Sequence, residues 1–558
     1  MRISGAKAII QCLLERGVDT VFGYPGGSVL PLYDALLDSP LRHVLTVHEQ
    51  GAAHAADGYA RASGRVGVCI ATSGPGATNL VTGLAAAYLD SVPVLAITGQ
   101  VPTTLIGRDA FQEVDITGIT LPVTKHNFLV KHADKLVEVM RLALRIACLG
   151  RPGPVLVDVP RDVQTALVEY RPLPPGNQEK GEPSAGAIRL AHEAAAAISA
   201  AKRPVLVVGG GVVAADAYNE IRSLAEKCFI PVVSTLMGLG AFPGSHPQYL
   251  GMTGLHGLRP ANNAVHAADT IIAVGSRFSD RLTGNRERYA DNKTIIQLDI
   301  DPAEIDKNVA VSIGLTGDLK QLLQIITERV QPGSIEEWWN TIRTWQNEAP
   351  AKDNTEKLTG TWIMKHIAAQ TAGRPYIFAT DVGQHQMWAA QHLSINEPRT
   401  WLTSGGLGAM GFGLPAALGA QLAVPGKRVI HIAGDGGFKM TGNELYTVAR
   451  LGLPIISVII NNHGLGMIRQ LQQVFFEQRY SACDLPHPVD YVAFAAAFGV
   501  KAVTVDTKDE FAAAFAAAQA ANQPQVIIAN ISSEDMVTPM VQPGAALNDY
   551  IRFNAASG

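Results

Sequence analysis

The residues that could do chemistry gather in one stretch of the chain, residues 434–462. A short β-rich run, 428–433, leads into the turn Gly434-Asp435-Gly436-Gly437 and an amphipathic segment, 441–451; the apolar run 453–460 then ends at Asn461-Asn462. This order of strand, glycine turn, helix and strand predicts a βαβ unit. Because its two strands are parallel, their carboxyl ends open into one crevice, where Asp435 and Asn462 should face each other.

The pair of side chains predicts a site for a metal ion and a diphosphate group. A carboxylate and a side-chain carbonyl are hard oxygen ligands of the kind that Mg²⁺ prefers, and phosphate oxygens normally fill its open positions. The glycines at 434, 436 and 437 let the main chain approach a diphosphate closely, and the following helix directs its N-terminus at the anion.

The ordered set of residues is more specific than its glycines. Gly-x-Gly should occur about five times by chance in a chain with 54 glycines among 558 residues. Gly-Asp-Gly at a strand end, 24 intervening residues and Asn-Asn at the end of the next strand resemble the fingerprint of the thiamin diphosphate decarboxylases and carboligases. An ordinary βαβ turn with a surface Asp and Asn is the alternative.

Thiamin diphosphate chemistry needs a further carboxyl group in a dry pocket away from the metal. The carboxylate exchanges a proton with the aminopyrimidine, which in turn deprotonates thiazolium C2. Glu49 suits this task because it lies at a predicted strand-to-helix junction, between Val47 and Gly51-Ala52-Ala53, with little nearby to solvate or pair it. A glutamate stabilised by the helix dipole is the alternative for Glu49 alone. The predicted metal and diphosphate site, called the cradle below (residues 434–437 with Asn462), favours the catalytic role.

Three sets of alternating strands and helices must position these groups. The first set reaches about residue 165, with strands at 20–23, 44–47, 66–71, 94–98 and 155–159 and an alanine-rich helix from His48 to about Ser63. The second has a helix at about 187–201 and strands at 204–208, 270–274 and 294–298, and the third runs from 361 to about 531. The polar stretch 170–186 is interpreted as a connector, and so is the segment 331–359, in which Trp338, Trp339 and Trp345 are expected on a helix. The pattern predicts an α/β fold of three doubly wound domains with mainly parallel sheets.

Composition limits the class of protein. A chain of 558 residues is long enough for three to four domains of ~150 residues, and 47% hydrophobic residues with a net charge of −4 indicate a soluble globular protein without nucleic acid as a partner. No apolar run approaches the ~20 residues of a membrane span and no signal-peptide pattern follows Met1, so we expect no membrane association and a cytoplasmic location. The cysteines lack CxxC spacing and are expected to be buried structural thiols: Cys12, Cys69, Cys148, Cys228 and Cys483.

Nearly the whole chain resembles the catalytic subunits of the acetohydroxyacid synthase (acetolactate synthase) family. The matching stretches are FGYPGG (22–27), HEQGA (48–52), TSGPGATN (72–79), DAFQE (109–113), GRPGPV (150–155), TDVGQHQMW (380–388) and SGGLGAMGFG (404–413). The resemblance implies a thiamin pyrimidine-binding domain (1–168), a Rossmann-like FAD-binding domain (187–345) and a domain for thiamin diphosphate and Mg²⁺ (360–540). It also implies a homodimer or homotetramer in which Glu49 reaches the cofactor across a subunit interface, and it allows a small regulatory subunit.

The roles of the family's residues carry over onto the matching positions. The resemblance implies that Glu49 activates the aminopyrimidine, that Gly26 lines the catalytic side of the cofactor, and that Met410 wedges between its rings. The remaining implied catalytic residues are Phe111, Gln112 and Arg281. The implied cofactor contacts are Gln384, His385, Gly408, Gly434, Gly436, Gly437 and Met467, and the implied Mg²⁺ ligands are Asp435, Asn462 and the main chain of Gly464.

The middle set carries features of a nucleotide site. Three glycines after a strand suit a dinucleotide phosphate, and an acid at the end of a later strand suits a ribose or adenine edge. Taken alone, these features fit any Rossmann-like site or none. The resemblance implies a structural FAD, which takes no redox part in the main reaction, held by Gly209, Gly210, Gly211, Thr235, Leu236, His256, Gly275, Arg277, Asp299, Ile300 and Asp318.

The reaction that the resemblance implies belongs to branched-chain amino acid biosynthesis. Pyruvate is decarboxylated, and the hydroxyethyl-thiamin carbanion adds to the ketone of a second 2-keto acid, pyruvate or 2-ketobutyrate. Arg281 matches the arginine that binds the acceptor carboxylate, for which a bidentate guanidinium is suited. An ion pair between Arg281 and Asp280 is not expected, because adjacent residues are not well placed for one.

Three positions depart from the family's pattern. Leu471 replaces a usual tryptophan, Arg161 a lysine and Leu255 a methionine. In the family the tryptophan favours 2-ketobutyrate as the acceptor, so Leu471 predicts weaker discrimination against pyruvate.

Two other kinds of protein are the alternatives. One is another thiamin diphosphate enzyme, such as a decarboxylase, a glyoxylate carboligase or a flavin-using pyruvate oxidase. The presence of Glu49 argues against the glyoxylate carboligase, which lacks it. The other is a non-catalytic nucleotide-binding protein on the same fold. The combination of Glu49 with Asp435 and Asn462 argues against that alternative.

Overall fold

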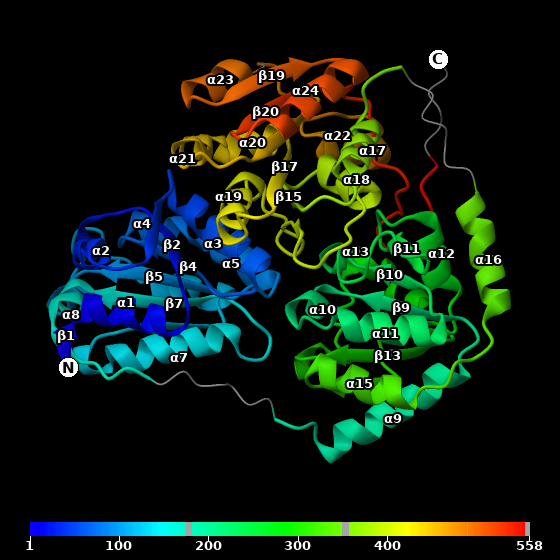
Figure 1. The fold of residues 1–558 in the computed structure, drawn as a ribbon, viewed down its shortest axis with the longest axis horizontal. Coiled ribbons are helices and arrows are strands. Elements are labelled where there is room, and N and C mark those ends of the chain that lie inside the picture. Colours follow the sequence, from blue (N-terminus) through cyan, green and yellow to red (C-terminus); the bar gives the residue numbers. More distant parts are fainter. Residues whose placement is uncertain (174–180, 349–355, 488, 553–558) are drawn as a thin grey trace. The chain divides into compact units, whose positions relative to one another are not determined.

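The chain forms two compact units in the computed structural model, which describes residues 1–173, 181–348, 356–487 and 489–552 (Figure 1). The first unit takes the described residues of 1–179, 374–386 and 402–533, and the second takes those of 180–373, 387–401 and 534–558. The two predicted connectors, 170–186 and 331–359, lie partly outside the described residues. The predicted domain bounds 1–168, 187–345 and 360–540 stay a prediction.

The part of the chain that the structure describes contains three six-stranded sheets, and the strand pairs described within them are parallel. The first unit holds two of them. One contains β2 (Thr20–Gly23), β3 (Arg42–Leu45), β4 (Gly67–Ala71), β5 (Val94–Gln100), β6 (His126–Leu129) and β7 (Val155–Pro160); the other contains β15 (Tyr376–Thr380), β16 (Trp401–Leu402), β17 (Arg428–Gly434), β18 (Ile456–Asn461), β19 (Lys501–Val505) and β20 (Gln525–Asn530). The second unit holds β9 (Pro204–Val208), β10 (Val232–Ser234), β11 (Tyr249–Met252), β12 (Thr270–Val274), β13 (Thr294–Asp299) and β14 (Ile313–Thr316). A small antiparallel pair, β1 (Arg2–Ser4) and β8 (Leu167–Glu169), lies outside these sheets.

The order of strands in each sheet shows where ligands can bind. The two sheets of the first unit share one topology, β3-β2-β4-β5-β7-β6 and β16-β15-β17-β18-β20-β19, while the sheet of the second unit runs β11-β10-β9-β12-β13-β14, the Rossmann order. The order reverses between β2 and β4, between β15 and β17, and between β9 and β12. In doubly wound sheets, ligands bind at the carboxyl ends of the strands at such reversals. The predicted α/β class with three doubly wound parallel sheets is confirmed.

Helices cover both faces of each sheet because side chains alternate along a strand. In β4, Val68 and Ile70 point into a core shared with α1 (Gly5–Glu15), α2 (Leu30–Leu37) and α7 (Leu136–Cys148), while Cys69 and Ala71 point into a second core with α3 (Glu49–Ser63). Burial on both faces explains why such strands appear in the sequence as continuous apolar runs.

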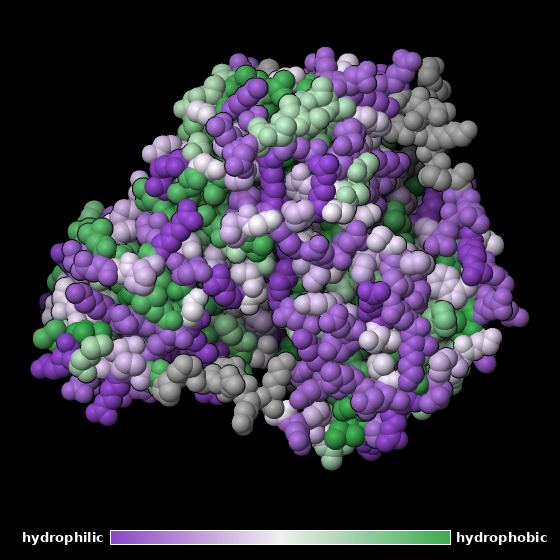
Figure 2. All heavy atoms as spheres, in the orientation of Figure 1, coloured by the Kyte–Doolittle hydropathy of each residue, from purple (hydrophilic) through white to green (hydrophobic). Residues whose placement is uncertain are grey.

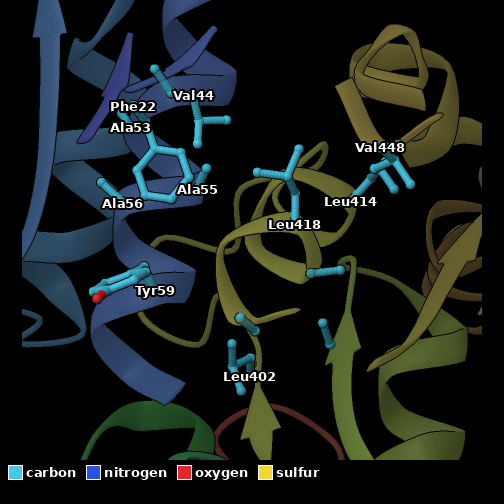
Figure 3. Packing of buried hydrophobic residues seen from close by; sticks show 14 of the residues in the cluster. Phe22, Val44, Ala53, Ala55, Ala56, Tyr59, Leu402, Leu414, Leu418 and Val448 are labelled. Carbon is cyan, nitrogen blue, oxygen red and sulfur yellow. The ribbon is translucent and has the colours of Figure 1, made fainter. Parts of the chain in front are cut away.

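The second core continues from one sheet of the first unit into the other. It contains Phe22 and Val44 from the first sheet, and Leu418 and Val448 from the elements around the other (Figure 3). The helices α3 and α19 (Gly413–Ala423) meet main chain to main chain, because a Cβ at Gly58 would overlap the carbonyl of Ala416 and one at Gly419 would overlap the carbonyl of Ala55. The two sheets therefore share one apolar core.

The remaining helices follow the same layered pattern. Those of the first unit are α4 (Pro75–Asn79), α5 (Val81–Leu89), α6 (Ile116–Thr120), α8 (Arg161–Thr165), α20 (Asp435–Thr441), α21 (Leu445–Arg450), α22 (Gly466–Phe475), α23 (Tyr491–Ala497) and α24 (Lys508–Ala520). Those of the second are α9 (Ala185–Ala200), α10 (Gly210–Ala214), α11 (Tyr218–Cys228), α12 (Arg259–Ala267), α13 (Asp280–Thr283), α14 (Arg286–Ala290), α15 (Leu319–Arg329), α16 (Glu336–Asn347) and α17 (Gly360–Thr371), and α18 (Gln384–His392) follows β15. Figure 2 shows mostly hydrophilic side chains over the visible face of the second unit. Within the described ranges, no helix is long and apolar enough to span a bilayer.

Two predicted element bounds are wrong for local reasons. The helix predicted at 441–451 begins earlier, since the glycine turn itself forms α20; it is then broken by the 3₁₀ turn η7 (Gly442–Glu444) before α21. The strand predicted at 44–47 ends at Leu45, because the main-chain N–H groups of Val47 and His48 donate to the carboxylate of Glu444.

Two further expectations fail on burial. The helix expected in the segment 331–359 is α16, but it does more than connect, since its Trp338 and Ile342 lie one helical turn apart in the core of the second unit. Cys148 is exposed on the last turn of α7, whereas the other four cysteines are buried as predicted.

We expect Gly419→Ala to destabilise the protein by about 1–3 kcal/mol, because the added methyl group would overlap the main chain of α3 in a closely packed core. Thermal and urea unfolding monitored by circular dichroism would measure the loss. The matched control is Gly426→Ala, where an added Cβ meets nothing within 4 Å. Equal stability of the two variants would contradict the tight contact of α3 and α19.

Candidate active site

The predicted cradle lies at the carboxyl ends of two neighbouring strands. β17 and β18 are parallel, with Gly434 opposite Ile460, so Asp435 and Asn462 follow at the same edge of the sheet. Both side chains are buried, with 2% and 7% of their surface exposed. This edge adjoins the reversal of strand order between β15 and β17, where a doubly wound sheet binds its ligand.

A small amide network fixes the orientation of Asn462. Its Nδ2 donates to Oε1 of Gln384 (3.2 Å), its Oδ1 accepts from the main-chain N–H of Gly464 (3.2 Å), and Gln384 Nε2 donates to Oε1 of Gln470 (2.9 Å). The network needs a glycine at 466, because a Cβ there would overlap both Gln384 and Asn462. The carbonyl oxygen of Asn462 is therefore turned away from Gln384.

The donor set at this edge fits Mg²⁺. Burial raises the pKa of Asp435 to about 6, against the opposing effects of the Gly436 N–H and the charge of Lys439. A bound divalent cation would offset this desolvation of the carboxylate. Across the described residues no group of three or more His, Cys, Asp or Glu side chains could hold a metal ion. Asp435, Asn462 and the carbonyl of Gly464 suit a hard cation that takes its other ligands from a diphosphate.

The neighbouring side chains fit the diphosphate. His385 is 4% exposed, its Nε2 has no hydrogen-bond partner, and burial lowers its pKa to about 4, so the ring is neutral at pH 7. A neutral imidazole with an unsatisfied nitrogen can donate one hydrogen bond to a phosphate oxygen. Gly436 lies beneath Met410, whose Cε would be 3.5 Å from an added Cβ, and Gly437 lies against Asp381.

The turn that carries Met410 is held by a buried acid, Asp381, which had no predicted role. Asp381, at the end of β15, accepts the N–H of Gly411 with both carboxylate oxygens (3.0 and 3.1 Å) and the N–H of Val382 (2.7 Å). Gly408 and Gly411 take positive φ angles of 67° and 88°, so the turn requires glycine at both positions. Asp381 could have been identified from the sequence, because it is an acid that directly follows a strand, β15, beside the reversal between β15 and β17.

The predicted catalytic carboxyl group begins α3. Glu49 is 9% exposed, and its Oε2 accepts a hydrogen bond from Nδ2 of Asn79 (2.9 Å). Glu49 was expected to have little nearby to pair with it, and it has this one partner; Asn79 is a residue that sequence reasoning missed. An added Cβ at Gly76 would lie 3.2 Å from Oε1 of Glu49, so the turn after β4 brings the main chain close to this carboxyl group.

The same turn gathers two more predicted residues. A Cβ at Gly26 would overlap the side chain of Thr72, and a Cβ at Gly74 would lie 2.9 Å from Gln112. Gly26 and Gln112 thus lie at the reversal between β2 and β4. Phe111 is 87% exposed, in a loop held by Glu113, whose carboxylate accepts the N–H groups of Gly107 and Ala110.

The predicted FAD residues line the carboxyl edge of the sheet in the second unit. Cβ atoms at Gly209 and Gly211 would overlap or crowd the main chain of Gly275, so these glycines let the turns after β9 and β12 touch at the reversal. Asp318 caps α15 through the N–H groups of Lys320 and Gln321 (3.0 and 3.2 Å). Close packing therefore suffices to explain why residues 209, 211 and 275 are glycines, and helix capping suffices to explain Asp318.

The remaining residues of that edge fit a dinucleotide. His256 has a buried Nδ1 without a partner, and burial lowers its pKa to about 4. Asp299 is buried at the end of β13, Ile300 is 38% exposed beside it, and Gly275 takes a φ of 59°. Thr235 and Leu236 follow β10, and Arg277 follows β12, at the same edge.

Arg281 corrects one expectation. Its Nε lies 3.6 Å from Oδ2 of Asp280, and both side chains are 72% exposed, so the ion pair does form on the short helix α13. Such an exposed pair contributes little to stability. The main-chain carbonyl of Arg281 accepts the N–H of Leu255 (2.9 Å), and Leu255 and Asp280 line a cavity of about 420 Å³ with the loops 284–287 and 543–544. Of the other departures, Arg161 is exposed and Leu471 is half-buried on α22.

Three family models match the chain in order. They are the thiamine pyrophosphate enzyme N-terminal TPP binding domain (3–119), the central domain (191–326) and the C-terminal TPP binding domain (381–529). The chain is also 47% identical over 570 residues to the acetolactate synthase large subunit of Mycobacterium tuberculosis, which covers 99% of this chain and 91% of that relative. This chain belongs to the acetolactate synthase family.

Relatives from distant organisms agree. The probable acetolactate synthase large subunit of Methanocaldococcus jannaschii is 45% identical over 569 residues, covering 99% of this chain and 95% of the relative. The large subunit of acetolactate synthase isozyme 2 of Escherichia coli is 44% identical over 553 residues, covering 98% and 99%. The resemblance seen in the sequence and thiamine pyrophosphate as the cofactor are confirmed, while Mg²⁺, FAD and the residue roles stay predictions.

Burial of His385 makes a pH-dependent difference in stability. Its folded pKa of about 4 lies below the ordinary value, so the unfolded chain takes up a proton first as the pH falls from 6.5 toward 4. Over that range we expect the unfolding free energy of the cofactor-free protein to fall more steeply than that of His385→Gln, by about 1.4 kcal/mol per pH unit. Urea unfolding at pH 7, 6 and 5 would test this. Parallel curves would show that the imidazole is not desolvated.

Proposed function

We propose that this protein is an acetolactate synthase that condenses two molecules of pyruvate, with loss of CO₂, to 2-acetolactate, and that it also takes 2-ketobutyrate as the acceptor. The main support is 44–47% identity to acetolactate synthase large subunits over nearly the whole chain, in which Glu49 provides a buried carboxyl and Asp435 and Asn462 form the cradle. The synthase names of these relatives favour this reaction over the glyoxylate carboligase and pyruvate oxidase alternatives.

Each residue in the proposal has a task that its surroundings support. Bound thiamine pyrophosphate supplies the electron sink for decarboxylation. Glu49 exchanges a proton with the aminopyrimidine, and the amide of Asn79 keeps one oxygen of that carboxylate in place. Asp435, Asn462 and the carbonyl of Gly464 hold Mg²⁺, and His385 with the glycines of the turn binds the diphosphate. Met410, whose Cε lies close to Gly436, would support the bound cofactor.

The rest of the proposed assembly follows the family. The edge lined by residues 209–211 would hold FAD as a structural group, and Arg281 would bind the acceptor carboxylate. The protein acts as a homodimer or larger homo-oligomer, in which Glu49 serves the partner's cofactor. Exposed apolar side chains between 105 and 121 support a surface that a second copy covers: Leu105, Phe111, Ile119 and Leu121. The words "large subunit" in the names of the relatives support a small regulatory partner. A cytoplasmic location stays a prediction.

Product analysis tests the function directly. Purified protein with thiamine pyrophosphate, Mg²⁺ and FAD should convert pyruvate to 2-acetolactate. An equal mixture of pyruvate and 2-ketobutyrate should give more acetolactate than acetohydroxybutyrate, because Leu471 replaces the tryptophan that shapes the acceptor pocket in the family. Leu471→Trp should raise the acetohydroxybutyrate share. Acetaldehyde or acetate without a condensation product would overturn the proposal. A product ratio unchanged by Leu471→Trp would remove only the pocket argument.

Glu49→Gln separates proton exchange from cofactor binding. We expect turnover to fall by at least about a hundredfold, because the amide cannot exchange a proton with the aminopyrimidine, while the affinity for thiamine pyrophosphate changes little. Steady-state rates and titration of the cofactor by tryptophan fluorescence would measure both. Glu15→Gln, a half-buried glutamate of α1, is the control. Retained turnover in Glu49→Gln would exclude the assigned role.

A further inference from the structure

A buried glutamate outside the assigned machinery reaches the main chain beside Glu49. Glu444 lies in η7, between α20 and α21, and 1% of its surface is exposed. Its Oε1 accepts the N–H groups of Val47 (3.0 Å) and His48 (3.3 Å), and its Oε2 accepts the hydroxyl of Thr447 (2.9 Å). The carboxylate therefore connects the half of the first unit that carries the cradle with the two residues directly before Glu49.

The contact needs a glycine on the opposite side. A Cβ at Gly51, in the first turn of α3, would overlap Oε1 of Glu444. The close approach is thus a feature of two residues nearly 400 positions apart, and an alanine at either position would change it.

Two further side chains of α21 hold the same segment. Arg450 donates to the carbonyl of Leu45 (2.9 Å), and the hydroxyl of Thr447, whose one hydrogen goes to Glu444, lies 3.4 Å from the same carbonyl. Glu444, Thr447 and Arg450 are spaced at i, i+3 and i+6, so they lie on one face of the helical turn. This Glu444 clamp, made of Glu444, Thr447 and Arg450, satisfies both the donors and the carbonyl at the junction of β3 and α3.

Burying the carboxyl group of Glu444 costs free energy, so its presence needs an explanation. Within the described residues no Lys, Arg or His acts on the charge of Glu444, and burial raises its pKa to about 7 despite its three hydrogen bonds. Removing a carboxylate from water without a cationic partner costs free energy, and such groups concentrate at functional sites.

We propose that Glu444 is a positioning residue: it fixes the turn Val47–His48 and thereby sets where the first residue of α3, Glu49, presents its carboxyl group. The inference rests on the proposed role of Glu49. His48 is the N-cap of α3, in an extended conformation with φ −148° and ψ 150°, and its Nδ1 accepts the N–H of Gln50 (3.1 Å). Releasing the N–H of His48 would let this cap, and with it the start of the helix, shift.

The variants separate positioning from stability. Glu444→Ala removes the acceptor; Glu444→Gln keeps an oxygen for the two N–H groups, with its amide nitrogen facing a Thr447 hydroxyl that can accept. Thr447→Val removes one support of the carboxylate. Glu15→Ala is the control, because Glu15 also joins distant segments, accepting from Arg141 (2.6 Å) and from the N–H of Leu173 (3.1 Å), but contacts none of these residues.

The first readout uses the cofactor-free protein. Hydrogen–deuterium exchange of the peptide 44–52, followed by mass spectrometry, should be at least about tenfold faster in Glu444→Ala, since a hydrogen bond to a carboxylate is lost at two amides. Glu444→Gln should stay near the wild type, and Glu15→Ala should leave this peptide unchanged. Unchanged exchange in Glu444→Ala would overturn the proposal.

The second readout follows the proton that Glu49 is proposed to control. Exchange of the C2 hydrogen of bound thiamine pyrophosphate for deuterium, measured by NMR after acid quenching, should slow by about tenfold or more in Glu444→Ala together with kcat. The KM for pyruvate and the affinity for the cofactor should hold, and Glu444→Gln should restore most of the rate. Faster amide exchange with unchanged C2 exchange would overturn the proposal and leave Glu444 a structural group.

A second variant and one further result of the exchange measurement keep the positioning role of Glu444 testable. Should Glu444→Ala not fold, Thr447→Val provides the test: we expect the same direction of change in both readouts, and wild-type values in both would contradict the proposal. If the wild type makes no acetolactate while bound thiamine pyrophosphate still exchanges its C2 hydrogen, the proposed function fails and the positioning role of Glu444 is still tested by that exchange.

Discussion

The contact of α3 with α19 is the interaction on which the rest of the first unit depends. Glycines at 58 and 419 allow the main chains of the two helices to touch, and the apolar core around them belongs to both sheets at once (Figure 3). Because the interior of a protein is close-packed, one sheet cannot move relative to the other without opening this core. The reach of Glu444 to Val47, over a hydrogen bond of 3.0 Å, is available only in that fixed arrangement.

Each candidate site lies where a sheet reverses its strand order. Gly26 and Gln112 lie at the reversal between β2 and β4, Asp381 and Asp435 at that between β15 and β17, and Gly209 at that between β9 and β12. A crevice at this position is lined by main chain and by the first residues after each strand. Ligand chemistry is therefore decided by short turns, while the strands beneath are free to be wholly apolar.

The sequence predicts the strands well because parallel strands buried on both faces have few polar residues; β2, β9 and β12 were predicted with the bounds they have. Asp435 and Asn462 could be predicted because each directly follows such a strand. Contacts made by side chains across long sequence separations could not: Asn79 with Glu49, and Glu444 with the end of β3, leave no periodic pattern. Two features could each require glycine at 209 and 211: binding of a phosphate group and the close approach of Gly275. Only the close approach is seen in the contacts.

The path of the chain has a consequence for synthesis on the ribosome. The face of the first sheet that carries α3 is covered by α19, and about 350 residues lie between Ser63 at the end of α3 and Gly413 at the start of α19. At translation rates of about 5–20 residues per second, the alanine-rich surface of α3 stays uncovered for roughly 20–70 seconds. A nascent chain of this protein thus exposes the apolar face of α3 long after its first sheet can form, until α19 emerges in the last quarter of the chain.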